Sequence, residues 1–143
     1  DGWEVVSCEP TSSIRFERYG PEVIRRLGLR AIVGKTTMGP ATVNALRDVG
    51  GVFLSKIGVC GNLLAQQVRG VTEVHFLQEL GKTEATWVFE VERLGPFFVA
   101  IDACGSSYFE QLDASVRANL ENAADQLGIP HDFDFTVVSA RDE

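Results

Sequence analysis

Short apolar runs and helix-like stripes of apolar residues alternate along the 143 residues of this chain. Strands are predicted where apolar and β-branched residues follow one another, at 3–8, 29–33, 50–55, 133–139 and twice within 86–105. Helices are predicted where apolar residues recur every three or four positions, at 21–28, 40–49, 58–70 and 110–127. Pro21 and Pro40 suit first helical positions, and Gly28 suits a left-handed cap. The alternation predicts one mixed α/β domain.

Three polar loops follow predicted strands, at 9–15, 34–39 and 102–107. In α/β sheets, ligands gather beyond the carboxyl ends of the strands. A functional site is therefore expected among these loops.

The first loop, with the sequence PTSSIR, combines hydroxyl residues with an arginine. Thr11 or Ser12 can cap the following turn. If the segment turns helically, Arg15 comes round to the same face as these hydroxyls. An arginine fork beside hydroxyls suits a carboxylate, which it can bind through two charge-assisted hydrogen bonds. The same residues also describe an N-cap followed by a surface arginine, and both interpretations stay open.

The second loop begins with GKTT, which resembles the end of a phosphate-binding P-loop. The first glycine of that motif would fall at Leu29, inside an apolar strand, so a nucleotide P-loop is not expected. Lys35 still stands at the end of a strand, where it can offer a point charge to an anion or simply face solvent. In the third loop, Asp102 can act as a base or order a turn, and the serines have no suitably placed histidine.

Composition and charge narrow the classes of function. The chain is 45% hydrophobic and 23% charged, and no apolar run approaches the roughly 18 residues of a membrane span. No signal segment is apparent, and no membrane is expected as a partner. The net charge of −7, without a dominant basic stripe, argues against nucleic acid as a partner. Cys8, Cys60 and Cys104 are widely spaced, so this chain is expected to hold no metal and to occupy a reducing compartment, the cytoplasm.

The charge is unevenly distributed. Residues 1–35 hold six of the thirteen Lys and Arg residues and five of the twenty acids, a net of +1. Residues 36–143 have a net charge of −8. An anion would be attracted, if anywhere, to the first quarter of the chain, although charge alone favours an ordinary solvated face.

Three stretches together resemble one family: GWEVVSCEPTSSIRFE, AIVGKTTMGP and EVHFLQELGKTEATWVFEVERLGPFFVAIDACGSS. Their order and spacing resemble the C-terminal domain of iron–sulfur (class I) fumarate hydratases, which is the β subunit in two-subunit relatives such as L-tartrate dehydratase. The resemblance implies an α/β fold, a swivelling β/β/α domain. We expect this domain at residues 1–109, with residues 110–143 as a helix and strand extension packed on it.

The resemblance also implies an activity, the reversible hydration or dehydration of a C4 dicarboxylate such as fumarate, malate or tartrate. It implies a [4Fe–4S] cluster held by an α-type partner subunit or domain, with none bound by this chain. By motif match, Thr11 is the catalytic hydroxyl near the proton abstracted from carbon. Ser12 helps to bind substrate, Arg15 clamps a carboxylate, and Lys35 contacts the same substrate.

The chain departs from the family pattern at several positions. The family's upstream RD…H segment has no match in this chain. Glu9 stands where relatives usually have glycine, and Thr36 and Thr37 stand where relatives often have two glycines. A carboxylate at Glu9 would repel a dianion if it pointed inward. The alternative function is a stand-alone, non-catalytic interaction module that kept the fold. The sequence leaves open which dicarboxylate is used and whether a homodimer forms.

Overall fold

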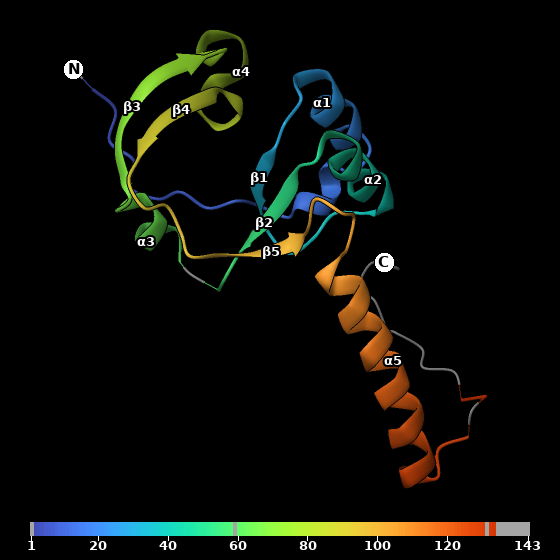
Figure 1. The fold of residues 1–143 in the computed structure, drawn as a ribbon. Helices are drawn as coiled ribbons and strands as arrows, with labels where there is room; N and C mark the ends of the chain where they lie inside the picture. Colours follow the sequence, from blue (N-terminus) through green and yellow to red (C-terminus); the bar gives the residue numbers. More distant parts are fainter. Residues whose placement is uncertain (1, 59, 131, 134–143) are drawn as a thin grey trace. The chain divides into compact units, whose positions relative to one another are not determined.

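The structure, a computed structural model, describes residues 2–58, 60–130 and 132–133, and the predicted mixed α/β class is confirmed (Figure 1). The chain forms two compact units, Asp1–Ser107 and Tyr108–Glu143. The described strands are β1 (Ala31–Gly34), β2 (Val52–Lys56), β3 (Val68–His75), β4 (Thr86–Val91) and β5 (Phe97–Ile101). The described helices are the 3₁₀ turn η1 (Ser13–Phe16), α1 (Gly20–Leu27), α2 (Pro40–Val49), α3 (Gly61–Ala65), α4 (Leu77–Glu84) and α5 (Tyr108–Leu127).

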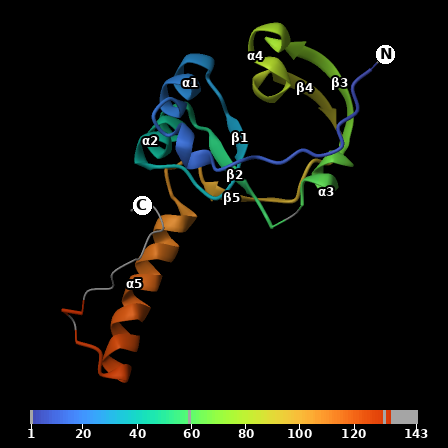
Figure 2. The same cartoon turned by 180° about the vertical axis from the view of Figure 1, so that it is seen from behind.

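The first unit contains two sheets. One has the strand order β1-β2-β5, in which the central strand β2 is parallel to β1 and antiparallel to β5. The other is the antiparallel pair β3-β4. Helices α1 and α2 pack against each other on one side of the three-stranded sheet, as the view from behind in Figure 2 shows. The buried core here includes Ile24, Leu46, Phe53 and Ile101.

Local signals in the sequence placed α1 and α2 correctly. Pro21 and Pro40 stand in the first turns of the two helices, where the missing N–H costs nothing. Gly28 and Gly50 end them with φ angles of 59° and 67°, the left-handed conformation that glycine adopts without strain.

The strand predicted at residues 3–8 is wrong, because this segment has no strand partner. It is an extended arm beside the β3-β4 hairpin, and the ring of Trp3 packs edge-on against Trp87 at 5.0 Å. Val6 is 73% exposed, so the apolar pattern of the arm does not mark a core strand. A short apolar run can thus pack on a neighbouring pair of strands without forming ladder hydrogen bonds.

The helix predicted at residues 58–70 is also wrong beyond its first turns. Helix α3 ends at Ala65, and β3 begins three residues later. Gln67 fixes this change of direction, because its side-chain amide both donates to and accepts from the backbone of Gly95, at 2.8 Å each way. The strand β3 and the following helix α4 were not predicted at all.

Helix α5 begins at Tyr108 and ends at Leu127, close to the predicted 110–127, and has no buried residue. Gly128 follows it with a φ of 66°, the left-handed conformation in which helices commonly end. The strand predicted at 133–139 lies outside the described residues apart from Phe133. None of the described helices combines the length and the apolar character needed to cross a membrane.

Gly34, at the end of β1, is required by its surroundings. A Cβ atom there would meet the ring of Phe53 and would stand 2.5 Å from Ser13 Oγ. We therefore expect Gly34→Ala to lower the free energy of unfolding by about 1–3 kcal/mol, the usual cost of overpacking, in a urea titration. Gly70→Ala is the matched control, because nothing lies within 4 Å of the position that its methyl group would take, and a change of equal size there would contradict this account.

Candidate functional site

The turn after Pro10 lies beside the carboxyl end of β1. Ser12 pairs in parallel with Lys35 as an isolated bridge. The buried hydroxyl of Ser13 accepts a hydrogen bond from the Lys35 backbone N–H at 2.9 Å and donates to the Thr11 carbonyl at 3.4 Å. The expectation that Thr11 or Ser12 caps the turn is wrong, because Ser12 stands at the N-cap position without a side-chain cap bond. The seryl side chain that fixes the turn is that of Ser13.

Arg15 returns to the hydroxyl side of the turn, as helical geometry predicts. Its Nη2 donates to Thr11 Oγ1 at 2.6 Å, and its Nε donates to the Ser12 carbonyl at 3.3 Å. Both Thr11 and Arg15 are exposed, so the pair faces solvent. The structure thus joins three of the four predicted site residues directly.

Lys35 joins this group through its backbone. Its side chain is exposed, and the ammonium makes no hydrogen bond or ion pair within the described part of the chain. The next residue, Thr36, has a φ of 62°, which turns the chain sharply away from β1. Lys35 therefore stands at the strand end with its charge available to a ligand.

The third predicted loop does not belong to this site. Because β5 runs antiparallel to β2, loop 102–107 leaves the sheet at the edge where β1 and β2 begin. Asp102 Oδ1 accepts the backbone N–H groups of Cys104 and Ser106 at 2.9 and 2.8 Å. The aspartate therefore orders a turn, which was one of its two predicted roles.

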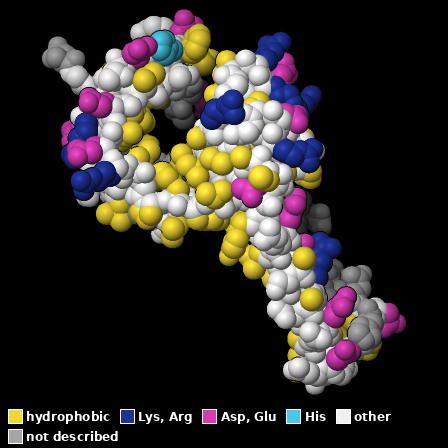
Figure 3. Space-filling model, in the orientation of Figure 1, with side chains coloured by type: hydrophobic (Ala, Val, Ile, Leu, Met, Phe, Trp, Pro, Cys, Tyr) yellow, Lys and Arg dark blue, Asp and Glu magenta, His cyan; other side chains and the backbone are white. Residues whose placement is uncertain are grey.

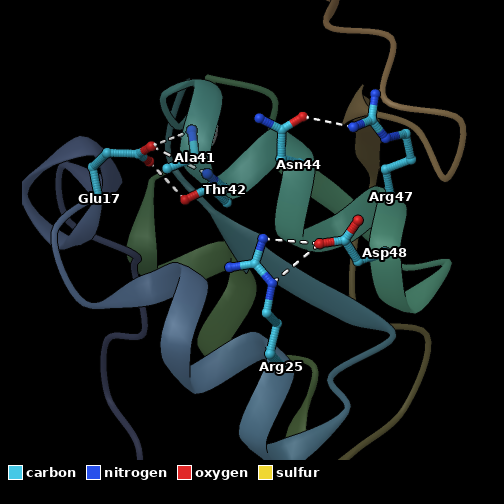
Figure 4. Close-up of polar contacts among 7 residues, drawn as sticks. All are labelled: Glu17, Arg25, Ala41, Thr42, Asn44, Arg47 and Asp48. Carbon is cyan, nitrogen blue, oxygen red and sulfur yellow. Dashed lines mark hydrogen bonds and ion pairs between the residues drawn. The ribbon is translucent and has the colours of Figure 1, made fainter.

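Glu17 is a site-shaping residue that the sequence did not reveal (Figure 4). Its carboxylate accepts the backbone N–H groups of Gly39, Ala41 and Thr42 at 2.8–3.1 Å and the Thr42 hydroxyl at 2.6 Å. These are the unsatisfied donors at the start of α2, where the helix dipole also favours a negative charge. The available signal was a helix that begins at Gly39–Pro40 without a Ser, Thr or Asp cap of its own.

An open apolar cavity of about 410 Å³ lies next to the turn. It reaches from Thr11 and Ser13 to α1 and β1, and Phe16, Tyr19 and Val33 line it while 41–58% exposed. Lys and Arg side chains gather at the surface over α1 and α2 in Figure 3. The cavity beside the turn is thus apolar, and the two arginines of α1 are paired with acids, Arg25 with Asp48 and Arg26 with Glu22.

The cysteines do not form a metal site within the part of the chain that the structure describes, where no three His, Cys, Asp or Glu side chains gather as ligands. All three thiols are free. Cys60 and Cys104 are exposed, whereas partial burial raises the pKa of Cys8. These residues therefore do not fit the three-cysteine holder of an iron–sulfur cluster.

The chain belongs to the Fumarase C-terminus family, whose model matches residues 1–112. The fold class predicted from the resemblance is thereby confirmed. The chain is similar to a protein of Methanocaldococcus jannaschii named, provisionally, L(+)-tartrate dehydratase subunit beta, with 40% identity over 120 residues. That match covers 84% of this chain and 62% of the relative.

Two further relatives extend the comparison. The L(+)-tartrate dehydratase subunit beta of Escherichia coli K12 is 38% identical over 107 residues, covering 75% of this chain and 53% of the relative. A protein of Geobacillus stearothermophilus provisionally named fumarate hydratase class I is 37% identical over 113 residues, covering 79% of this chain and 22% of the relative. The chain thus spans between half and two thirds of the length of the two beta-subunit relatives.

The Glu17 contacts lead to a stability prediction. Glu17→Gln puts an amide NH₂ where backbone N–H groups need an acceptor, so the free energy of unfolding should fall by about 1.5–3 kcal/mol, the range for hydrogen bonds to a charged group. Urea denaturation measures this. Glu22→Gln is the control, because Glu22 makes an exposed i,i+4 pair with Arg26 that should contribute little. Equal effects of the two substitutions would argue against the role of Glu17.

Proposed function

We propose that this chain is the β-type portion of a hydro-lyase that adds water to, or removes it from, a C4 dicarboxylate such as fumarate, malate or tartrate. The observation that supports this most is the hydrogen bond from Arg15 to Thr11 at the carboxyl end of β1, beside Lys35. It puts a cationic fork, a hydroxyl and a second cation at one strand end. We call Thr11, Ser12, Arg15 and Lys35 the half-site.

In this proposal Arg15 holds a carboxylate of the substrate. A guanidinium has five N–H donors. Two of them, on Nε and Nη2, bind the turn itself and so hold the side chain in place. The remaining donors have no acceptor among the described residues, so a carboxylate can take them without displacing a protein contact.

Thr11 is the proposed proton-handling group. Because its oxygen accepts from Arg15, an alkoxide formed there would be stabilised by the guanidinium, while the hydroxyl proton is directed elsewhere. The Ser12 hydroxyl and the Lys35 ammonium are proposed as further substrate contacts. Removing a proton beside a carboxylate builds negative charge on it, and cations placed beforehand at that point stabilise the transition state.

The other half of the site is proposed to come from an α-type partner subunit or domain that carries the [4Fe–4S] cluster. When bound, such a cluster supplies Lewis-acid chemistry at the substrate hydroxyl. The described cysteines of this chain do not gather to hold it. We place the protein in the cytoplasm because its three free thiols fit a reducing compartment.

One observation favours the alternative, an interaction module. Helix α5 has no buried residue, and Leu112, Val116 and Leu120 lie at helical spacing with 44–53% of their surface exposed. An apolar stripe of this kind suits a partner protein. This alternative does not use the half-site, so a ligand titration separates the two functions.

We expect L-malate to shift the backbone amide signals of Thr11, Ser12 and Lys35 in a ¹⁵N-resolved NMR titration of the whole chain. The method detects millimolar binding, so it does not require the partner for affinity. Arg15→Ala should abolish the shifts, because the carboxylate then loses its fork. Arg26→Ala is the matched control, since Arg26 is an exposed arginine of α1. An absence of shifts at high malate concentration would contradict the proposed half-site, and so would shifts that persist in Arg15→Ala.

A second prediction concerns the assembled enzyme. With the cluster-bearing partner present, Arg15→Ala should lower kcat/KM by at least about tenfold, because a charged hydrogen bond to the reacting carboxylate contributes about 1.5–3 kcal/mol. Steady-state kinetics of wild type, Arg15→Ala and Arg26→Ala would measure it. An unchanged kcat/KM in Arg15→Ala would exclude Arg15 from the site.

A further inference from the structure

An ion pair stands at the carboxyl end of β2, and none of the roles above uses it. Lys56, the last residue of β2, donates from Nζ to Glu9 Oε1. The Lys56 side chain is only 7% exposed, whereas that of Glu9 is 38% exposed. Lysine is almost never buried to this degree without a partner. The ion pair is thus part of the largely buried structure at the carboxyl end of β2.

The register of the sheet places this pair beside the half-site. Gly34 and Ser55 are the last residues that β1 and β2 pair with each other, and Lys35 and Lys56 are the next residues on these two segments. Because side chains alternate along a strand, both lysines lie on the face opposite Gly34 and Ser55. Ser12 pairs with Lys35 on the side of β1 away from β2, so three neighbouring segments end side by side. We call the residues at these ends, Ser12, Lys35 and Lys56, the row.

Glu9 is drawn into this row as an ionised group. The hydrogen bond from Lys56, followed by the charges of Lys56 and Lys35, lowers the pKa of its carboxyl group below the ordinary value. The carboxylate that stands where relatives usually have glycine is therefore paired with a cation. It does not present an uncompensated negative charge to an incoming anion.

The charges around the row match a dicarboxylate. Arg15, Lys35 and Lys56 are three cations and Glu9 is one carboxylate, a net charge of +2. A C4 dicarboxylate dianion carries −2. Without Lys56 the same group would have a net charge of only +1, and the Glu9 carboxylate would lose its ion-pair partner. A monoanion gains less from the second positive charge than a dianion does, because the attraction scales with the product of the charges.

We propose that Lys56 is a specificity-determining residue of the half-site: by neutralising Glu9 it keeps the net charge at +2 and so selects dianions over monoanions. This inference rests on the proposed function. Lys56 acts through Glu9 and the local field, and need not touch the substrate.

The test is a charge cycle on the whole chain. L-malate and L-lactate, a dianion and a monoanion with the same α-hydroxy acid group, are titrated by NMR at about pH 7.5, where the carboxyl groups of both are ionised. The proteins are wild type, Lys56→Met, Glu9→Gln and the double variant, at constant ionic strength. The net charge of the group is +2 in wild type, +1 in Lys56→Met, +3 in Glu9→Gln and again +2 in the double variant.

We expect Lys56→Met to weaken malate binding by about tenfold and lactate binding by only about threefold, since one charge is removed near a dianion or a monoanion. Glu9→Gln should tighten malate binding, and the double variant should return it to the wild-type value. The control is the exposed pair Arg69 and Glu92, for which Arg69→Met and Glu92→Gln change the net charge of the chain equally but away from the row. Neither control should change the malate-to-lactate ratio.

Each outcome decides between the claims. If wild type binds malate and Arg15→Ala abolishes binding, the half-site stands whatever Lys56 does. An unchanged malate-to-lactate ratio in Lys56→Met, whether both ligands bind equally more weakly or neither changes, would then overturn this inference alone. If Lys56→Met does not fold, the double variant and Glu9→Gln carry the test, and a Glu9→Gln variant without tighter malate binding overturns it. If the wild-type chain binds no malate, both the half-site and the role of Lys56 are contradicted.

Discussion

A single carboxylate, that of Glu17, ties together the two segments from which the half-site is built. It follows η1 directly and accepts the donors at the start of α2, including the Gly39 N–H at 2.8 Å. Because α2 follows β1 after only five residues, 35–39, a bond to its first turn also fixes the loop that begins at Lys35. The turn of Arg15 and the strand end of Lys35 are thereby held by one anchor. The same carboxylate satisfies backbone groups that would otherwise be left without acceptors.

Close approach of backbone is the second constraint on this arrangement. Ser13 can reach the Lys35 N–H only because Gly34 leaves room, and the ring of Phe53 fills the space on the other side. The turn therefore pairs with β1 like a short extra strand, in parallel, although it has only one bridge. This pairing extends the row of carboxyl ends by one segment. The hydroxyls thus end up at the strand ends, where α/β sheets bind their ligands.

Local signals predicted the parts of the fold that depend on local chemistry. Proline and glycine placed α1 and α2, apolar spacing placed α5, and apolar runs placed β1, β2, β4 and β5. The failures depend on distant partners. The arm at 3–8 has the composition of a strand but packs on a hairpin, and β3 starts where Gln67 meets Gly95, 28 residues further on. In the site, the turn of Arg15 could be predicted from residue spacing. The loop at 102–107 was assigned to the wrong end of the sheet, because the direction of a strand cannot be inferred from its local sequence.

The same reason explains how Glu9 is misread when it is considered alone. As a replacement for glycine it predicts repulsion of a dianion, and this counted in favour of a chain that had lost its chemistry. Its partner Lys56 lies 47 residues away and is itself inconspicuous at the end of an apolar strand. Together the two residues leave the net charge of their surroundings unchanged, so the departure at one position is compensated at the other. A charge that departs from a family pattern therefore bears on function only once its nearest opposite charge in space is known.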